Sequence, residues 1–203
     1  RVAGFGLVLR NPELLRLNAG IFLLHALMTG LFTTAPIAIF DTFGLPGEEH
    51  WRIYVPVLVV SILPVFPLIR WAEGSGQNGR VFRAAIIMLG VSMGLAAIGH
   101  AHPAPLVGAL LLFFIAFNYL EGALPSMISR RAPASHRGAA LGAYASSQFL
   151  GAFAGGAIGG LARGHFDVAG AFAACALLPV IWLLIPAVRV AQTSASEPLK
   201  TPT

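Results

Sequence analysis

Six apolar segments, each about 20 residues long or longer, constrain this chain more than any other feature. An α-helix rises about 1.5 Å per residue, so roughly 20 apolar residues cross the hydrocarbon core of a bilayer, which is about 30 Å thick. One such segment could be a buried helix of a soluble protein, but six in succession predict six transmembrane helices. The segments cover residues 14–40, 52–72, 80–99, 105–129, 138–162 and 168–188.

The composition supports a membrane protein and excludes several other classes. Hydrophobic residues make up 57% of the chain and charged residues only 10%, whereas soluble domains carry about 25% charged residues. The basic residues are scattered between apolar segments, which argues against a nucleic-acid-binding surface. Cys175 is the single cysteine, so no disulfide can form within the chain. We expect an all-α integral membrane protein without a metal site or another cofactor.

The basic residues predict the orientation of the helices. If the N-terminus is cytoplasmic, all but two of the 13 Lys and Arg residues fall in inside segments, and only Arg52 and Arg163 fall outside. This bias has the sign that the positive-inside rule requires. Both termini are therefore predicted to be cytoplasmic. The inside loops hold Arg70, Arg80, Arg83, Arg130, Arg131 and Arg137.

The spacing of the six segments predicts two repeats. Residues 14–99 hold three spans and residues 103–188 hold three more, and an odd number of spans inverts the second repeat. Inverted repeats are typical of secondary transporters, which bind their substrate near the middle of the membrane. Residues 1–13 are interpreted as the remnant of a cytoplasmic linker, and the polar residues 189–203 as a disordered tail. Because the chain begins at Arg1, we expect a fragment of a longer protein.

The fifth apolar segment contains a ladder of glycines in the stretch GAYASSQFLGAFAGGAIGG. Gly151, Gly155 and Gly159 are four residues apart, so they share one helix face on which another helix can approach closely. The ladder resembles the antiporter motif of the major facilitator superfamily, in which a proline stands at the position of Gly156. We expect helix packing at all of the ladder glycines, which are Gly142, Gly151, Gly155, Gly156, Gly159 and Gly160.

Three further stretches carry the same resemblance: NPELLRLNAGIFLLH, GEEHWRIYV and FNYLEGALPSMISRRAPASHRGAALGAYASSQFLGAF. They are similar to the C-terminal half of the YajR-like drug/proton antiporters in that superfamily. The resemblance implies one six-helix half of a twelve-helix fold in a bacterial inner membrane. It also implies proton-coupled efflux of small lipophilic compounds by alternating access. The implied partners are a missing N-terminal six-helix half, the lipid bilayer, protons and a small-molecule substrate.

Two other functions stay open at this stage. The superfamily uses one fold in both directions, so proton-coupled uptake of a small metabolite is an alternative. A six-helix membrane assembly or scaffold protein without transport is another. The sequence holds no nucleophile elbow, HExxH motif or P-loop, and we do not expect an enzyme.

Glu121 is the most informative polar residue, because it lies within the apolar stretch FFIAFNYLEGALPSM. A charged side chain at the centre of a membrane helix costs about 2.5–3.5 kcal/mol on insertion scales. Asn118, three residues earlier, shares its helix face. We expect Glu121 to bind and release a coupled proton at a central cavity. The alternative is a structural ion pair with Arg130, Arg131 or Arg137.

His25 is expected in the middle of the first span, and imidazole titrates near neutral pH. It could relay protons or bind substrate, but a neutral histidine bonded to a neighbouring helix is also open. Apolar side chains that could contact a lipophilic substrate, or simply pack, are Phe22, Met28, Phe114 and Phe117, and Gln148 is the polar candidate beside them.

Overall fold

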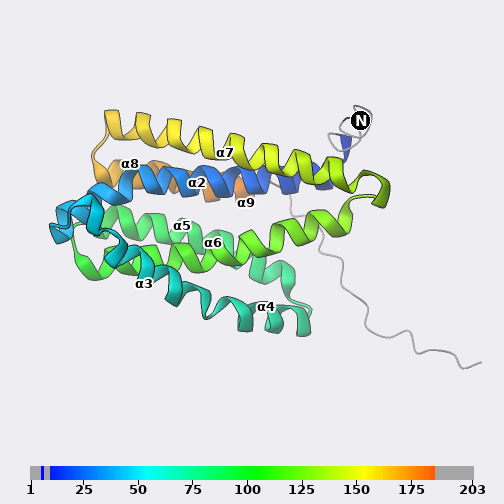
Figure 1. The fold of residues 1–203 in the computed structure, drawn as a ribbon, viewed down its shortest axis with the longest axis horizontal. Coiled ribbons are helices and arrows are strands. Elements are labelled where there is room, and N and C mark those ends of the chain that lie inside the picture. Colours follow the sequence, from blue (N-terminus) through cyan, green and yellow to red (C-terminus); the bar gives the residue numbers. More distant parts are fainter. Residues whose placement is uncertain (1–5, 7–9, 186–203) are drawn as a thin grey trace, which may run out of the picture.

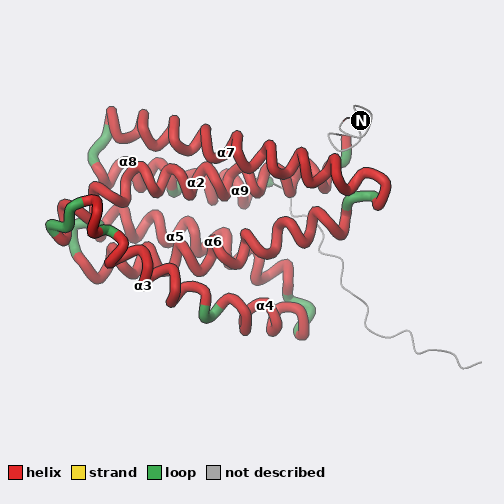
Figure 2. Tube along the Cα trace, viewed as in Figure 1, coloured by secondary structure: helices red, strands yellow, loops and turns green. Residues whose placement is uncertain are grey.

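The computed structural model describes residue 6 and residues 10–185 of the chain. These described residues form helices joined by short turns and contain no strand (Figure 2). The all-α class predicted from the apolar segments is therefore observed. Most of the proposed linker 1–13 and the whole of the proposed tail 189–203 lie outside the described residues.

The first helix, α2 (Pro12–Phe43), has clear start and stop signals. The Asn11 side-chain oxygen accepts hydrogen bonds from the backbone N–H groups of Glu13 and Leu14, at 2.9 and 3.3 Å. Pro12 needs no N–H in the first turn, and its fixed φ favours a helix. Gly44 ends the helix in the left-handed conformation, with φ of 66°.

The second predicted span, residues 52–72, is not one continuous helix. The short 3₁₀ turn η1 (Gly47–Glu49) leads into α3 (Trp51–Ile62), and α4 (Val65–Gly74) follows after a break at Leu63 and Pro64. Proline has no N–H for the helical ladder, and its ring clashes with the preceding turn. Helix α3 ends at Ile62, two residues before Pro64, so the break coincides with this proline.

The remaining helices coincide with the other predicted segments. The last segment is broken at Ala176, its second helix ends at Leu184, and the predicted residues 186–188 lie outside the described residues. The helices are α5 (Asn78–Gly99), α6 (Pro103–Arg131), α7 (Arg137–His165), α8 (Val168–Cys175) and α9 (Leu177–Leu184), with a 3₁₀ turn, η2 (Ala134–His136), before α7.

Length and hydropathy support membrane insertion most clearly for the first part of the chain. Among the described residues, four helical segments are long and apolar enough to cross a membrane: Pro12–Phe43, Gly47–Gly74, Asn78–Gly99 and Pro103–Arg131. Val168–Leu184 is apolar but shorter. Helix α7 has 29 residues, but its many glycines contribute little hydropathy. Six crossings and the inverted repeat therefore stay predictions.

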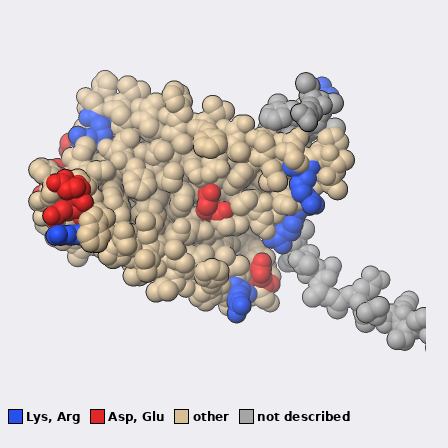
Figure 3. Space-filling view, viewed as in Figure 1, with Lys and Arg blue, Asp and Glu red and all other residues tan. Residues whose placement is uncertain are grey.

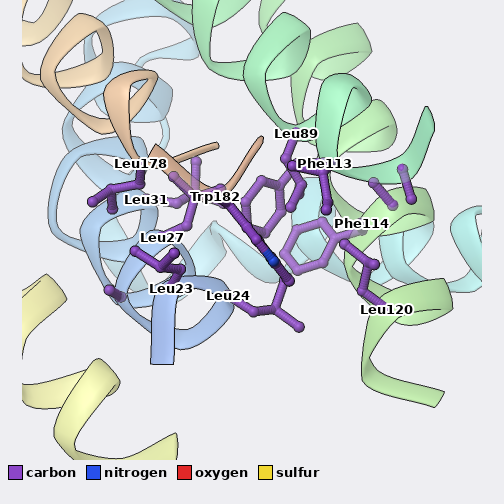
Figure 4. Close-up of a cluster of buried hydrophobic side chains, with 14 of the residues drawn as sticks. Leu23, Leu24, Leu27, Leu31, Leu89, Phe113, Phe114, Leu120, Leu178 and Trp182 are labelled. Carbon is purple, nitrogen blue, oxygen red and sulfur yellow. The ribbon is translucent and has the colours of Figure 1, made fainter. Parts of the chain in front are cut away.

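Successive segments run in alternating directions along the bundle, with α2 between α7 and α6 (Figure 1). Helix α2 packs most extensively against α7, α5 packs against α6, and α3 packs against α6. Between α2, α5, α6 and α9, leucine and aromatic side chains form the buried core (Figure 4). Its labelled members are Leu23, Leu24, Leu27, Leu31, Leu89, Phe113, Phe114, Leu120, Leu178 and Trp182.

Charged residues gather mainly at the two ends of the bundle, and the broad band between them is uncharged except for an acidic patch near its middle (Figure 3). One end carries the turns α4–α5 and α6–α7, and those arginines predicted to be cytoplasmic that the structure describes lie on the helices and turns at this end. The other end carries the acidic turn around Glu48 and Glu49. This separation suits a bilayer, but the side that faces the cytoplasm stays a prediction.

Candidate functional site

The packing of α2 against α7 brings the two helix backbones unusually close. A Cβ atom added at Gly151 would overlap the Phe22 backbone, and one added at Gly155 would overlap the Ala26 backbone. One added at Gly159 would collide with the Thr33 hydroxyl. Three of the ladder glycines therefore pack on α2, which is what small residues achieve between membrane helices.

The other ladder glycines do not take part in this contact. A Cβ atom at Gly142, Gly156 or Gly160 would meet no atom of the described chain within 4 Å. Gly156 and Gly160 each follow a contact glycine by one residue, which turns the side-chain direction by about 100°, and the nine residues between Gly142 and Gly151 turn it by about half a revolution, so all three lie on other faces of α7. Helix packing at these three positions is not seen among the described residues and stays a prediction.

A hydrogen bond between the two helices lies beside the glycine contact. The Thr29 hydroxyl lies 2.9 Å from the His25 carbonyl on its own helix and 2.8 Å from the Ala152 carbonyl on α7. Because one hydroxyl contacts carbonyls on both helices, it fixes the position of α7 along the axis of α2. As a result, polar side chains one turn away on each helix face one another.

Those side chains are His25 on α2 and Gln148 on α7, and Glu121 on α6 joins them. The Gln148 amide nitrogen lies 2.8 Å from His25 Nε2 and 3.5 Å from Glu121 Oε1. His25 Nδ1 lies 3.9 Å from Glu121 Oε2. Three predicted site residues from three different helices thus form one polar triangle within an otherwise apolar bundle.

The triangle assigns a proton position to His25. With the Gln148 amide oriented as found, its nitrogen can only donate, so His25 Nε2 accepts and a neutral ring carries its proton on Nδ1. That proton faces the Glu121 carboxylate, whose Oε2 lies 3.9 Å from Nδ1. A small movement of either side chain would bring His25 Nδ1 and Glu121 Oε2 into hydrogen-bond range.

Several buried polar atoms of α2, α6 and α7 lack hydrogen-bond partners. Within the described residues, His25 Nδ1, Glu121 Oε2, Asn18 Oδ1 and the Tyr144 hydroxyl are buried without a hydrogen bond. Unpaired buried polar groups cost free energy unless they bind water, ions or ligands. The Glu121 side chain is 36% exposed, so the triangle is reachable from outside the bundle.

Asn18 and Tyr144 were not among the site residues predicted from the sequence. Tyr144 lies one turn before Gln148 on α7, and its hydroxyl is buried. Asn18 lies two turns before His25 on α2 and is 6% exposed. Helical spacing from the two predicted residues could have identified both.

Glu121 does not form an ion pair with the arginines that were considered as its partners. Among the described residues, the basic side chain within 4 Å of its carboxylate is that of His25. Arg131 instead lies 3.3 Å from Glu13, joining the start of α2 to the end of α6. Arg130 and Arg137 are exposed at the end of the bundle.

Asn118 shares a helix with Glu121, but its amide points elsewhere. It donates a hydrogen bond of 2.9 Å to the Ser61 hydroxyl on α3. Ser61 in turn bonds to the Leu58 carbonyl at 2.8 Å. Asn118 therefore connects α6 to the end of α3, just before the break at Pro64, and is not a member of the triangle.

The apolar candidates differ in their accessibility. Phe117 lies against His25, with ring centroids 5.8 Å apart, and is partly exposed beside the triangle. Phe22 and Met28 are also partly exposed. Phe114 is only 3% exposed and packs among core rings (Figure 4), so in this conformation it cannot contact a substrate.

Comparison with known proteins connects this architecture to a family. The model of the Major Facilitator Superfamily matches residues 1–156. The inner membrane transport protein YajR of Escherichia coli (strain K12) is 38% identical over 181 residues, which are 89% of this chain and 40% of that protein.

Further relatives are transporters of Buchnera aphidicola that are described as uncharacterised. The one from the subspecies Acyrthosiphon pisum is 30% identical over 71% of this chain and 37% of its own length, and the one from Baizongia pistaciae is 28% identical over 79% and 41%. The chain thus spans about two fifths of the length of these relatives. Most of the chain matches the family model, and we conclude that it belongs to the major facilitator superfamily, a family of membrane transporters and not of enzymes.

Proposed function

We propose that the complete protein is a secondary active transporter that exports small lipophilic compounds in exchange for protons. The described chain supplies the C-terminal six-helix half, and a preceding six-helix half supplies the other wall of the cavity. The bacterial inner membrane is the proposed location, in keeping with the name of the YajR relative, and both termini are proposed to be cytoplasmic. Supporting this are the family match and the arginines at one end of the bundle.

The observation that carries the proton coupling is the triangle of Glu121, His25 and Gln148. Ionisable residues inside membrane segments are costly and mark proton or ion pathways. Here a carboxylate and an imidazole lie 3.9 Å apart on α6 and α2, and each presents an unpaired atom. This is the arrangement that a group needs in order to take up a proton and pass it on.

Proton binding would change the contacts within the triangle. An ionised Glu121 attracts the His25 N–H group, whereas a protonated Glu121 can donate a hydrogen bond of its own. A change between these two arrangements would favour different relative positions of α6 against α2 and α7. Such a bistable contact is what alternating access requires of a coupling site.

Partly exposed side chains on α2 and α6 fit a lipophilic substrate, and Phe117 among them lies against His25. Phe117 and Phe22 offer aromatic surface, and Met28 offers a flexible thioether that adapts to different shapes. All three are partly exposed. A substrate bound here would lie next to Glu121, so occupation by substrate and by proton could exclude one another.

The test uses the full-length gene in cells that lack their own drug pumps. A panel of lipophilic compounds is screened for growth resistance, and energised efflux is measured for the compounds that respond. Glu121→Gln is compared with the wild type, because glutamine keeps the shape of a protonated acid but cannot release a proton. Glu48→Gln, in the exposed η1 turn, is the matched control.

We expect Glu121→Gln to lose proton-driven efflux and resistance while Glu48→Gln retains both. Unchanged proton-driven efflux in Glu121→Gln would refute the coupling role. Accumulation of a compound instead of its export would support the alternative of uptake of a small metabolite. Absence of transport across a broad panel would favour the scaffold alternative.

A further inference from the structure

A second feature of the bundle lies away from the triangle, between α4, α5 and α6. It is an open groove of about 250 Å³. Apart from Gln77, Arg80 and the Tyr119 hydroxyl, its lining is apolar. Trp71, Arg80 and Ala84 are exposed, so the groove opens to the outside of the bundle along α5.

The shape of the groove follows from the spacing along α5. Arg80, Ala84 and Met88 are four residues apart and line it in succession. At about 1.5 Å per residue, this row extends about 12 Å from the helix start towards the middle of the bundle. The small side chain of Ala84 leaves the hollow open, and Ile115 and Ala116 of α6 form its inner wall.

Polar groups are confined to one end of this groove. The Arg80 guanidinium bonds to the Gln77 side-chain oxygen at 3.4 Å and has no ion pair within the described part of the chain. Trp71 lines the same end, and Trp is enriched where membrane helices meet the headgroup region. The polar end of the groove therefore suits the headgroup region of a membrane, and the apolar remainder suits the hydrocarbon region.

The charges at this end are mainly positive. Helix α4 carries Arg70 and Glu73 near its end, and α5 carries Arg80 and Arg83 near its start. Three cations against one carboxylate attract an anionic headgroup, and a basic side chain near a membrane surface contributes about 1 kcal/mol to that attraction.

We propose that this groove binds an anionic phospholipid, with an acyl chain beside Ala84 and Met88 and the phosphate at Arg80. Arg80 is the reason for proposing an anionic lipid. Its guanidinium is the exposed cation that lines the groove, and it has no carboxylate partner among the described residues. A covering helix of the other half is the competing occupant. The proposal does not depend on proton coupling or on the direction of transport.

The test measures fluorescence of the full-length protein in detergent, with added lipids whose acyl chains carry bromine atoms that quench tryptophan. Trp71 is the reporter, since it lines the groove, and its signal is the difference between the wild type and Trp71→Phe. Brominated phosphatidylglycerol is compared with brominated phosphatidylcholine. Arg80→Gln removes the proposed phosphate ligand. Arg83→Gln, exposed on the same helix but outside the groove lining, is the matched control.

We expect phosphatidylglycerol to quench Trp71 at a lipid fraction about fivefold lower than phosphatidylcholine, a ratio typical of one basic contact. Arg80→Gln should remove this preference and Arg83→Gln should keep most of it. Ala84→Phe should weaken quenching by both lipids, because the added ring fills the groove.

Equal quenching by the two lipids with no effect of Arg80→Gln would show non-selective surrounding lipid. No quenching assignable to Trp71 would show that protein covers the groove. Either result would overturn the proposal.

Discussion

The seam between α2 and α7 and the segment α3–α4 are both apolar, yet they are built in opposite ways. In the most apolar window of α2, 61% of the residues are buried, against 17% for the segment Gly47–Gly74. The seam uses Gly151 and Gly155 to bring backbones together, whereas α3–α4 exposes large side chains such as Leu63 and Phe66. In lipid, apolar surface alone does not drive helices together, so small residues and hydrogen bonds decide which helices pack.

The two regions also differ in their polar side-chain contacts. The tight seam places His25 next to Gln148, and α6 adds Glu121. The loose segment is connected to α6 through one described side-chain hydrogen bond, between Asn118 and Ser61. A precise site therefore coincides with the closest packing, and the loosely packed segment is free to contact lipid or the other half.

The largest effect is expected from adding a methyl group to the seam. Gly155→Ala should destabilise the protein by about 1–3 kcal/mol, because its Cβ overlaps the Ala26 backbone and the helices must separate. Gly156→Ala, its neighbour, meets open space and should be neutral or gain up to about 1 kcal/mol of helix propensity. Unfolding of the full-length protein in detergent measures both. Equal effects at the two positions would remove the distinction between the two regions.

The next effect concerns the polar contact across the seam. Gln148→Leu leaves His25 Nε2 without its partner and should cost about 1 kcal/mol, at the lower end for an unpaired buried group. A double-mutant cycle with His25→Leu should give a coupling energy of about 1 kcal/mol. Additive effects of the two substitutions would mean that the 2.8 Å contact between Gln148 and His25 contributes no coupling energy to the stability of the protein.

A smaller effect is expected where α6 meets the loose segment. Asn118→Leu removes the bond to Ser61 and should cost about 0.6 kcal/mol, the average for such bonds between membrane helices. Amide hydrogen exchange should increase around Ser61 and Pro64 and stay unchanged at the seam. Faster exchange at the seam as well would show that the two regions are not independent.

The smallest effect is expected on the exposed face of α4. Phe66 is 69% exposed, so Phe66→Ala should change the unfolding free energy by less than about 0.5 kcal/mol. The unfolding free energy of Phe66→Ala is measured in the full-length protein, where the other half could cover this face of α4. A loss of more than 2 kcal/mol would show that the other half buries this face.

The positions of the helices could be predicted from the sequence, but some of their interruptions could not. Apolar length alone located α2, α5 and α6 to within a few residues. Proline was a poor guide to breaks, because Pro36 and Pro125 lie inside continuous helices whereas Pro64 separates α3 from α4. Whether a proline breaks a membrane helix depends on which neighbouring groups satisfy the freed carbonyl, and that is a tertiary property.

The candidate site could be predicted only residue by residue. Glu121 and His25 were identifiable because polar residues in apolar segments are costly. Their meeting with Gln148 depends on the register of α7 against α2, which Thr29 and Gly155 set across 123 or more residues of chain. Asn118 shows the limit of reasoning from one helix: it is three residues from Glu121, but its amide bonds to Ser61.

The central claim is that Glu121 carries the coupled proton. The full-length protein is reconstituted into liposomes, a gradient of a substrate found in the panel is imposed without a pH gradient, and internal pH is recorded together with substrate movement. We predict that the wild type and Glu48→Gln move protons against the substrate, whereas Glu121→Gln moves the substrate without protons. Proton movement by Glu121→Gln equal to that of the wild type would contradict the account.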